Sequence, residues 1–572
     1  MFSFNFLKKN LKKDFSNFKV IKLALLSDSS SQLLRQAIRG YGYECQIDYE
    51  IYESDYNQID MQILDISSDL YSFNPDFIFI NKSSEHLLKK FYKLDLNGKQ
   101  NFAMIERGII DQYCKVISEN LKSKIIINTF PEINDYVFGN FATQVESSFV
   151  YQIKKTNLEL MNLSRTLNNL LICDLSSLTT LFGYNFSFDP KMYVNADLVY
   201  SLDFLPYIGK NLTDIIQASS GVIKKCLILD LDNTTWGGII GDDGLEGIQV
   251  GELGIGKAFS QFQDWVKQLK NRGIILAICS KNNENIAKEP FVNHPDMILN
   301  LEDFAVFIAN WDNKPDNIIH IQNILNIGFD SIVFIDDNPY ERGIVKKAIP
   351  QITVPNLPDD PSDYLGFLRN LNLFETSSYT EEDLLRSSKY REEAERSIFK
   401  KTFLEEDDFL KSIKMTSEVK FFDEFLIPRV AQLSQRSNQF NLRTKRYSEE
   451  DIRRISVSKD YFTLSFTLND NFGNHGLISA VILKKETNGV LFIDTWIMSC
   501  RVLKRGVENF VLNSIVNLAN TEGFSVISGE YIPTTKNELV KNLYFDFGFS
   551  SDSDRWMLET ANYKIKQNYI NI

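Results

Sequence analysis

The sequence predicts a multidomain α/β protein, and three observations support this prediction. The chain has 572 residues, which is too long for one core and indicates about three or four domains. From about residue 20, short apolar runs alternate with segments of helical spacing, as in parallel strands joined by crossover helices. Hydrophobic residues make up 44% of the chain and charged residues 24%, which is typical of globular proteins.

The first two predicted domains share this alternating pattern. In residues 1–215 the predicted strands are VIKLALL, DFIFI, KIIIN and LLICDL, with the helical segment SSSQLLRQAIRG after the first of them. In residues 221–373 the predicted strands are KCLILDL, ILAICS, MILN and SIVFIDD. We therefore expect two successive α/β domains.

The remaining sequence predicts a connector and an α+β domain. Residues 374–414 form the connector, with a charged helix that starts at Thr380 in a Thr-x-x-Asp-type cap. Residues 415–572 contain YFTLSFTLND, GLISAVILKK and GVLFIDTWIMSC, which alternate as strands do, and the helical segment RGVENFVLNSIVNLAN. This pattern favours an antiparallel sheet.

Composition excludes several classes of protein. The net charge of -13 argues against a nucleic-acid-binding surface. No segment approaches about 18 uninterrupted apolar residues, so we expect no membrane span and a cytoplasmic location. The cysteines lack CxxC pairs, which indicates reduced thiols and no zinc site. They are Cys45, Cys114, Cys173, Cys226, Cys279 and Cys500.

Polar residues follow the predicted strands of the second domain in order. They are Asp230, Asp232, Ser280, Lys314, Asp336 and Asp337. Residues at the carboxyl ends of parallel strands meet at one edge of a sheet, so we expect these side chains to converge. Carboxylates that end a buried strand are costly unless a cation or hydrogen bonds compensate them. The alternative is a set of strands that stop in Asx-rich turns.

Converging side chains of these types suit phosphoryl transfer. Carboxylates form the hard-oxygen site that Mg²⁺ prefers, and the Ser hydroxyl and Lys ammonium can donate to phosphate oxygens. Asp230 can attack phosphorus, while Asp232 protonates the leaving oxygen and then activates water. A metal ion would screen the repulsion between carboxylate and phosphate.

The run DLDNT, Ser280, Lys314 and IDDNP are similar to the four motifs of the haloacid-dehalogenase (HAD) superfamily of phosphatases. The resemblance implies that Asp230 is the nucleophile and a metal ligand. It implies that Asp232 is the acid/base, with its backbone carbonyl on Mg²⁺, and that Asp336 is the third ligand.

The same resemblance implies a phosphate-binding set of Thr234, Ser280 and Lys314, with Thr234 also orienting its loop. Asp337 belongs either to the metal shell or to a pair with Lys314. Fifty positions separate Asp230 from Ser280, and 34 separate Ser280 from Lys314. These gaps leave no room for a large cap domain, so we expect an open site that a partner or a bulky substrate must cover.

A longer stretch, DLDNTTWGGIIGDDGLEGIQVG, resembles the FkbH-like family of HAD subfamily IIIC, as do FETSSYTEEDLLRSSKYREEA, NQFNLRTKRYS, NFGNHGLISAV and MSCRVLKRGVE. The resemblance covers nearly the whole chain. It implies an SGNH-like N-terminal domain, a HAD Rossmannoid core without a large cap, and a GNAT-like C-terminal domain. The best-known members of the family take a glyceryl unit from 1,3-bisphosphoglycerate, remove phosphate, and load the unit onto the phosphopantetheine thiol of an acyl carrier protein. The resemblance therefore implies a similar activity here, in a polyketide-type or other secondary-metabolite pathway.

The C-terminal domain offers a candidate pair for acyl capture. Cys500 ends an apolar strand and His475 lies in a Gly-bounded loop, and a thiolate is a good acyl acceptor. The alternative is a buried strand cysteine with an unrelated histidine. Lys504 stands where the GNAT pyrophosphate loop has its first glycine, which favours carrier-bound acyl groups over coenzyme A.

The N-terminal domain departs further from its implied family. Ser27-Asp28-Ser29 replaces the Gly-Asp-Ser motif of SGNH hydrolases, and the domain's single histidine, His86, lacks the Asp-x-x-His spacing. These differences favour a docking or scaffold role over hydrolysis by Ser29.

The leading hypothesis is a HAD phosphatase and glyceryl transferase that acts on a small phosphorylated carboxylic acid and an acyl carrier protein. The alternative is a stand-alone small-molecule phosphomonoesterase whose flanking domains bind substrate or partner. A third hypothesis is a non-catalytic scaffold that binds a carrier protein, against which the intact DxDxT motif argues.

Overall fold

The computed structural model describes residues 2–379, 390–392, 396, 399–400, 403, 405–437, 439–499, 502–534, 536–552 and 555–572. The chain divides into two compact units, Met1–Ala218 and Ser219–Ile572. Helix α12 (Leu205–Ser219) continues through position 215, so the first unit extends past the predicted end of the first domain. The boundaries that the sequence predicts inside the second unit, at 373 and 414, stay predictions.

The first unit is built on a five-stranded parallel sheet with the order β2-β1-β3-β4-β5. Its strands are β1 (Lys19–Ser27), β2 (Ile47–Glu53), β3 (Phe77–Asn81), β4 (Lys124–Asn128) and β5 (Leu170–Cys173). The four predicted strands are confirmed. The edge strand β2 was missed because its sequence, IDYEIYE, mixes charged with apolar residues and its side chains are only partly buried.

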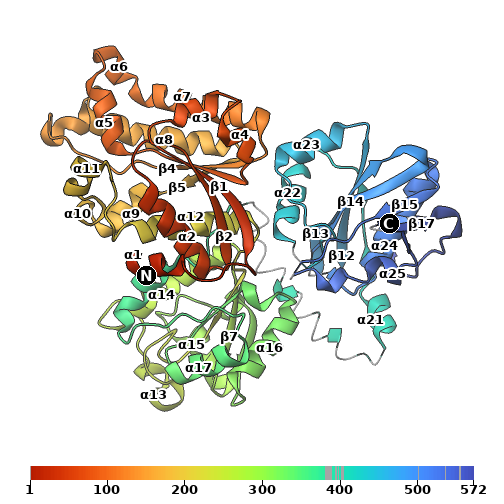
Figure 1. Cartoon of the computed structure of the whole chain (residues 1–572). Coiled ribbons are helices and arrows are strands. Elements are labelled where there is room, and N and C mark those ends of the chain that lie inside the picture. Colours follow the sequence, from red (N-terminus) through yellow and green to blue (C-terminus); the bar gives the residue numbers. More distant parts are fainter. Residues whose placement is uncertain are drawn as a thin grey trace. The chain divides into compact units, whose positions relative to one another are not determined.

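Helices cover both faces of this sheet (Figure 1). Residues of α1, α2 and α12 share one apolar cluster with the sheet, and residues of α3, α5, α7 and α8 share the other. The helices are α1 (Phe4–Asn10), α2 (Gln32–Glu44), α3 (Ile59–Leu64), α4 (Asp69–Phe73), α5 (Ser84–Tyr92), α6 (Leu96–Gln100), α7 (Phe102–Asn120), α8 (Phe149–Thr166), α9 (Leu175–Phe182), α10 (Tyr184–Ser187), α11 (Pro190–Ala196) and α12. A parallel sheet buried on both faces explains why its central strands are almost continuously apolar.

The second unit begins with a four-stranded parallel sheet of order β8-β7-β6-β9. Its strands are β6 (Cys226–Leu229), β7 (Ile275–Ser280), β8 (Phe304–Ala309) and β9 (Ile332–Ile335). The predicted strand MILN is wrong. The backbone N–H groups of Ile298 and Leu299 donate to the side chain of Gln263 instead of a neighbouring strand, and the strand forms later, at β8.

The helices of this region are α13 (Ile240–Gly247), α14 (Gly256–Asn271), α15 (Glu284–Asn293), α16 (Lys314–Leu325), α17 (Pro339–Ala348) and α18 (Tyr364–Leu371). The α-helices between β6 and β7 are α13 and α14, and α15 and β8 lie between β7 and α16. Two apolar clusters on these elements cover the two faces of the sheet.

The C-terminal part of the second unit contains a nine-stranded mixed sheet of order β16-β17-β15-β14-β13-β12-β10-β18, with β11 paired to β12. Its strands are β10 (Met415–Thr416), β11 (Val419–Lys420), β12 (Tyr461–Asp470), β13 (Gly473–Lys485), β14 (Val490–Met498), β15 (Val526–Gly529), β16 (Ser550–Asp552), β17 (Arg555–Glu559) and β18 (Ile570–Asn571). Its α-helices are α21 (Glu406–Ser412), α22 (Ile427–Arg436), α23 (Glu449–Val457), α24 (Val507–Thr521) and α25 (Leu543–Asp546).

The predicted strands and helix α24 are confirmed, but the expectation of a wholly antiparallel sheet is wrong. The chain leaves β14, runs through α24 and returns as β15, which makes β14 and β15 a parallel pair. A helical crossover of this length is the usual connection between parallel strands. The pair β10 and β18 is parallel as well.

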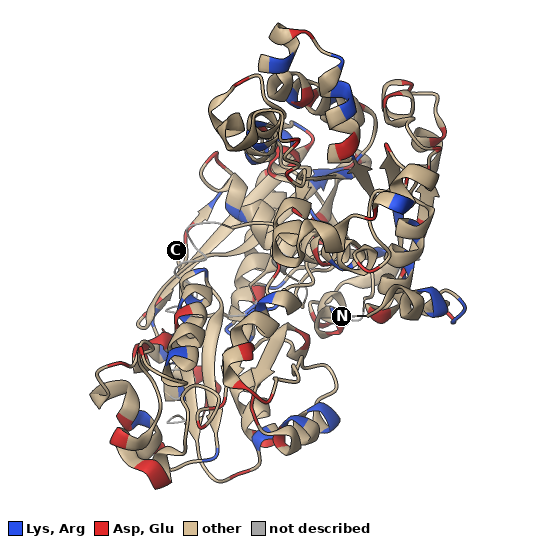
Figure 2. Cartoon of the chain, turned by 90° about the vertical axis from the view of Figure 1, so that its left-hand side faces the viewer, with Lys and Arg blue, Asp and Glu red and all other residues tan. Residues whose placement is uncertain are grey.

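The structure also bears on the predictions about the cysteines, the connector helix, membrane crossing and surface charge. Among the described cysteines, Cys45, Cys114, Cys173, Cys226 and Cys279 are not in disulfides. Thr380, the predicted start of the connector helix, lies outside the described residues, as does Cys500. Among the described helices, none combines the length and apolar character that a membrane crossing requires. Basic and acidic residues are interspersed along the chain in the view of Figure 2.

Candidate active site

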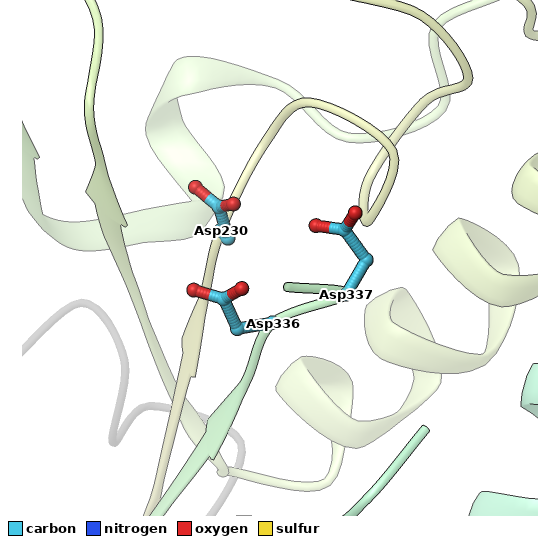
Figure 3. A group of neighbouring side chains, drawn as sticks. All are labelled: Asp230, Asp336 and Asp337. Carbon is cyan, nitrogen blue, oxygen red and sulfur yellow. The ribbon is translucent and has the colours of Figure 1, made fainter. Parts of the chain in front are cut away.

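The carboxylates predicted to converge lie at the ends of two neighbouring strands. β6 pairs with β9 in register, with Leu229 opposite Ile335, so the residues that follow these strands emerge side by side. The backbone N–H of Asp230 donates to the carbonyl of Ile335 at 3.0 Å. Figure 3 shows the carboxylates of Asp230, Asp336 and Asp337 facing a shared space.

These three carboxylates form a compact acidic group. Ligand oxygens of Asp230, Asp336 and Asp337 lie within 4.8 Å of one another. Asp230 is 7% exposed and Asp336 is fully buried. Burial, and then the neighbouring Asp230 carboxylate, raise the pKa of Asp336 and the pKa of Asp337.

The group fits a divalent cation. The buried Oδ1 of Asp230 has no hydrogen-bond partner among the described residues. Buried polar atoms are nearly always paired, so an unpaired carboxylate oxygen inside an acidic group indicates a missing positive partner. Mg²⁺ suits this position because it takes few carboxylates and keeps room for water and phosphate oxygens.

Lys314 supplies the positive charge nearest to this group. It is the first residue of α16, whose N-cap Asn313 accepts a hydrogen bond from the backbone N–H of Asp316. The buried Nζ of Lys314 lies 3.0 Å from Asp230 Oδ2 and 2.5 Å from Asp336 Oδ2. Burial alone would lower the pKa of Lys314, but the two carboxylates raise it above its ordinary value. Lys314 therefore remains protonated and forms ion pairs with Asp230 and Asp336. Asp337 belongs to the three-carboxylate group.

Thr234 connects the two loops that carry the carboxylates. Its fully buried hydroxyl accepts a hydrogen bond from the Asp337 N–H at 3.0 Å and lies 3.3 Å from Asp337 Oδ1. The adjacent Thr235 hydroxyl donates to the Asp230 carbonyl at 2.7 Å. This placement agrees with a loop-orienting role for Thr234, and its direct contact with phosphate stays a prediction.

Ser280 is the last residue of β7, the strand that pairs with β6 on the side opposite β9. It is almost fully buried, at the same carboxyl edge of the sheet as Asp230. The structure thus brings Ser280 to the edge where the sequence predicts it, and its contact with phosphate stays a prediction.

The side chain of Asp232 lies outside the three-carboxylate group. Its Oδ1 accepts hydrogen bonds from Trp236 Nε1 and from the Ile240 N–H, both at 3.0 Å, and its Oδ2 accepts from Asn282 Nδ2 at 3.2 Å. The predicted metal contact through the backbone carbonyl of Asp232 stays a prediction. Sequence reasoning missed Trp236 and Asn282, although Asn282 follows a strand end as closely as Asp232 does.

Trp236 offers a test of how Asp232 is positioned. Trp236→Phe keeps the buried ring in place but removes one of the three donors to Asp232. We expect about a tenfold fall in kcat for phosphate release with little change in KM, because the carboxylate that the sequence predicts to be the acid/base is no longer held in position. Steady-state kinetics would check this, with Trp265→Phe as the control for loss of an indole elsewhere in the same core. Equal kinetics for both variants would contradict the positioning role.

The C-terminal candidates lie in a separate part of the second unit. His475 lies within β13 and not in a loop, which corrects the prediction, and it is 1% exposed. Its Nε2 is 2.9 Å from Asp470 Oδ2, to which Arg505 also makes an ion pair at 3.2 Å. Because Cys500 lies outside the described residues, its predicted pairing with His475 stays a prediction.

Comparisons with known proteins place this geometry in context. The family model described as FkbH, N-terminal domain, matches residues 22–217. A crystal structure of the N-terminal part of the protein BF1531 from Bacteroides fragilis, containing a phosphatase domain complexed with Mg, is similar over 66% of this chain and 100% of that chain. The identity is 50% and the TM-score 0.64.

Two acetyltransferase structures show weaker similarity. The ribosomal-protein-S18-alanine N-acetyltransferase of Escherichia coli matches 25% of this chain and 91% of that chain, at 14% identity and a TM-score of 0.20. The spermidine N-acetyltransferase of Vibrio cholerae, in complex with CoA and spermine, matches 26% of this chain and 98% of that chain, at 13% identity and a TM-score of 0.21. The search among curated protein sequences gave no match.

The similarity covers all of the solved N-terminal part of BF1531, which contains a phosphatase domain. At 50% identity over the whole of the solved N-terminal part of BF1531, the two chains share a family and not just a fold. The chain belongs to the FkbH-like family of HAD-type phosphatases.

Proposed function

We propose that the chain removes the phosphoryl group of a small phosphorylated carboxylic acid in a Mg²⁺-dependent reaction and passes the acyl unit to a carrier protein. The observation that supports the phosphatase half best is the buried group of Asp230, Asp336 and Asp337 beside Lys314. A cluster of acids with one ammonium has the charge pattern needed to hold a phosphoryl group and a cation together.

Asp230, Asp336 and the backbone carbonyl of Asp232 would hold the cation, with Asp337 beside them in the same acidic group. Once bound, Mg²⁺ would screen the charge between carboxylate and phosphate and polarise the phosphoryl oxygens. Lys314 would remain as the protein's own positive charge against the phosphoryl oxygens. The Mg-complexed relative supports the choice of metal.

In the first step, a carboxylate oxygen of Asp230 attacks phosphorus and the bond from phosphorus to the ester oxygen breaks. Asp232 gives its proton to the departing oxygen. Burial raises the pKa of Asp232, which favours the protonated form that this step requires. In the second step, Asp232 takes a proton from water as the water attacks phosphorus and releases Asp230.

The absence of a cap domain forms part of this proposal. α13 and α14 are the α-helices between β6 and β7, and α15 and β8 precede Lys314. These elements belong to the core layers or lie directly against them. Water would therefore be excluded by a partner or by a bulky carrier-bound substrate.

For the acyl half, we propose 1,3-bisphosphoglycerate as substrate and Cys500 as the acceptor. The Cys500 thiolate attacks C1 of 1,3-bisphosphoglycerate and displaces inorganic phosphate, which leaves a 3-phosphoglyceryl thioester. The phosphatase site removes the 3-phosphate by hydrolysis, and the glyceryl unit then passes to the phosphopantetheine thiol of an acyl carrier protein, which regenerates the Cys500 thiol. Asp470 would orient the imidazole of His475 near this step, since it contacts Nε2 at 2.9 Å. The parallel β14–β15 pair within an otherwise largely antiparallel sheet supports a GNAT-like fold for this part. This activity would serve a polyketide-type or other secondary-metabolite pathway.

For the first unit, we propose an SGNH-like fold, which the parallel sheet with helices on both faces supports.

Intact-mass measurement after incubation with 1,3-bisphosphoglycerate tests the acyl half. The wild type should gain one glyceryl unit, and Cys500→Ala should gain none. Asp230→Asn should carry a phosphoglyceryl unit if capture precedes dephosphorylation. Cys45→Ala is the matched control, because burial raises the pKa of the Cys45 thiol to about 12 and makes it a poor nucleophile. An unmodified wild-type chain, or an equal adduct on Cys500→Ala, would reject acyl capture at Cys500.

A further inference from the structure

A second group of polar side chains lies at the carboxyl edge of the sheet in the first unit. β1 ends at Ser27 and β3 ends at Asn81, and these strands are neighbours, with β2 on one side and β4 on the other. The chain moves from β1 outward to β2 and then returns past β1 to form β3. In open parallel sheets, ligands bind outside the strand ends at the point where the strand order reverses.

The residues that follow these two strands are linked by hydrogen bonds. Asn81 Nδ2 donates to Ser27 Oγ at 3.0 Å, and Ser29 Oγ lies 3.4 Å from the same oxygen. Asp28 Oδ2 accepts a hydrogen bond from the Ser83 N–H at 2.8 Å. These contacts hold the two strand-end loops together and fix the direction of the Asn81 side chain.

Three buried polar atoms in this group have no hydrogen-bond partner among the described residues. One is Asp28 Oδ1, which lies 3.5 Å from His86 Nδ1. Two more have no charged group beside them in the described contacts. They are Asn81 Oδ1, on a residue that is 2% exposed, and the hydroxyl of Tyr200, on a residue that is 7% exposed. Tyr200 packs in the apolar cluster that contains Leu25 of β1 and Phe79 of β3, and burial, followed by the charges of Glu85 and Asp28, raises the pKa of Tyr200. Unpaired buried polar atoms reduce stability and are rare, which points to a ligand that completes them.

The position of His86 argues against hydrolysis by Ser29. Its Nδ1 lies 3.5 Å from Asp28 Oδ1, and its Nε2 lies 3.1 Å from Asp197 Oδ1. A general base for a serine needs one ring nitrogen on the hydroxyl, but both nitrogens of His86 face carboxylates. Among the described residues, the Ser29 hydroxyl contacts the Ser27 hydroxyl.

We propose that this edge of the first unit is a binding site for a small uncharged group that carries hydroxyl or amide N–H donors. Asn81 Oδ1 accepts from the ligand, and the Tyr200 hydroxyl donates to it or accepts from it. Two carboxylates, those of Asp28 and Asp197, lie against the single imidazole of His86, so the site repels phosphate esters and other anions. The proposal is independent of the phosphatase site at Asp230.

Histidine-selective ¹⁵N labelling of the full chain offers a direct test, because the sequence contains four histidines. His86→Asn assigns the His86 signals. The uncharged probes are methyl glycerate, as a free hydroxylated ester, and pantetheine, as the free form of a carrier-bound arm, and 3-phosphoglycerate is the anionic probe. We expect a saturable shift of the His86 signals with at least one uncharged probe and none with 3-phosphoglycerate.

Tyr200→Phe separates binding from folding. Because the Tyr200 hydroxyl has no partner among the described residues, its removal should leave Tm unchanged or raise it while weakening probe affinity about fivefold or more. Tyr49→Phe is the matched control, since the buried Tyr49 hydroxyl is bonded to Thr213 at 3.3 Å. That variant should lower Tm and keep the affinity.

Three results would overturn the proposal. The first is the absence of a saturable His86 shift with both uncharged probes. The second is an equal shift with 3-phosphoglycerate. The third is wild-type affinity in Tyr200→Phe. None of these results bears on phosphate release, which Asp230→Asn tests separately.

Discussion

Replacing Asp230 with Asn is expected to reduce phosphate release by about 10³-fold or more, because an amide cannot attack phosphorus as a carboxylate does. The fold should persist, since Lys314 still pairs with Asp336 at 2.5 Å and three carboxylates no longer crowd one another. Release of inorganic phosphate from 1,3-bisphosphoglycerate or 3-phosphoglycerate, measured with purified full-length chain and Mg²⁺, checks this expectation.

Asp242→Asn is the matched control for this experiment. Asp242 lies in the first turn of α13, which follows β6, but it is exposed and outside the carboxylate group. Its variant should keep turnover close to that of the wild type. Full turnover in Asp230→Asn would show that another group carries the reaction, and the proposed role of Asp230 would be lost.

Replacing Lys314 with Met is expected to lower the free energy of unfolding of the second unit by about 3–5 kcal/mol. The methionine fills most of the lysine volume, but Asp230 and Asp336 lose the ammonium that lies 3.0 Å and 2.5 Å from their oxygens. Uncompensated buried carboxylates repel one another and lack solvent. Denaturant unfolding, followed by the fluorescence of tryptophans in this core, measures the loss.

The same unfolding measurement, repeated with added Mg²⁺, tests whether the cation can replace the charge of Lys314. Binding to the folded state raises its stability, and the gain should be larger in Lys314→Met because the cation no longer competes with the ammonium. Lys281→Met is the matched control, since the ion pair of Lys281 with Glu341 involves a side chain that is 36% exposed and should contribute about 1 kcal/mol or less. Equal stability of wild type and Lys314→Met would mean that the lysine does not balance the carboxylates.

The parallel sheets were predictable because their strands carry their own signal. A strand covered by helices on both faces is apolar at nearly every position, as KIIIN and CLIL show. Both β2 and β8 were missed. β2 lies at a sheet edge and is only partly apolar, and β8 follows the apolar run MILN, which the pattern predicts as the strand instead. In the C-terminal sheet, alternation revealed the strands but not the parallel return through α24, which depends on tertiary packing.

The candidate site was predictable as far as it depends on strand ends. Asp230, Ser280 and Asp336 each follow or end a strand, and the sheet order alone brings them to one edge. From the sequence, Asp337 could belong either to the metal shell or to a pair with Lys314. The side-chain distances place Asp337 in the carboxylate group, and they pair Lys314 with Asp230 and Asp336.

Contacts between distant side chains were not predictable. The donors to Asp232 from Trp236 and Asn282 depend on how two loops fold against each other. The same holds in the first unit, where the sequence drew attention to His86 but not to Asp197, which lies 111 positions away and contacts its Nε2. Hydrogen-bond partners of this kind leave no periodic trace in a sequence.

A crystal structure of the full chain with Mg²⁺ and beryllium trifluoride, a mimic of a bound phosphoryl group, tests the central claim most directly. We expect Mg²⁺ at about 2.1 Å from carboxylate oxygens of Asp230 and Asp336, with beryllium bonded to the other Asp230 oxygen and its fluorides facing Lys314. Metal and fluoride bound away from Asp230, or an unchanged pair of Lys314 ion contacts with no metal beside them, would contradict it.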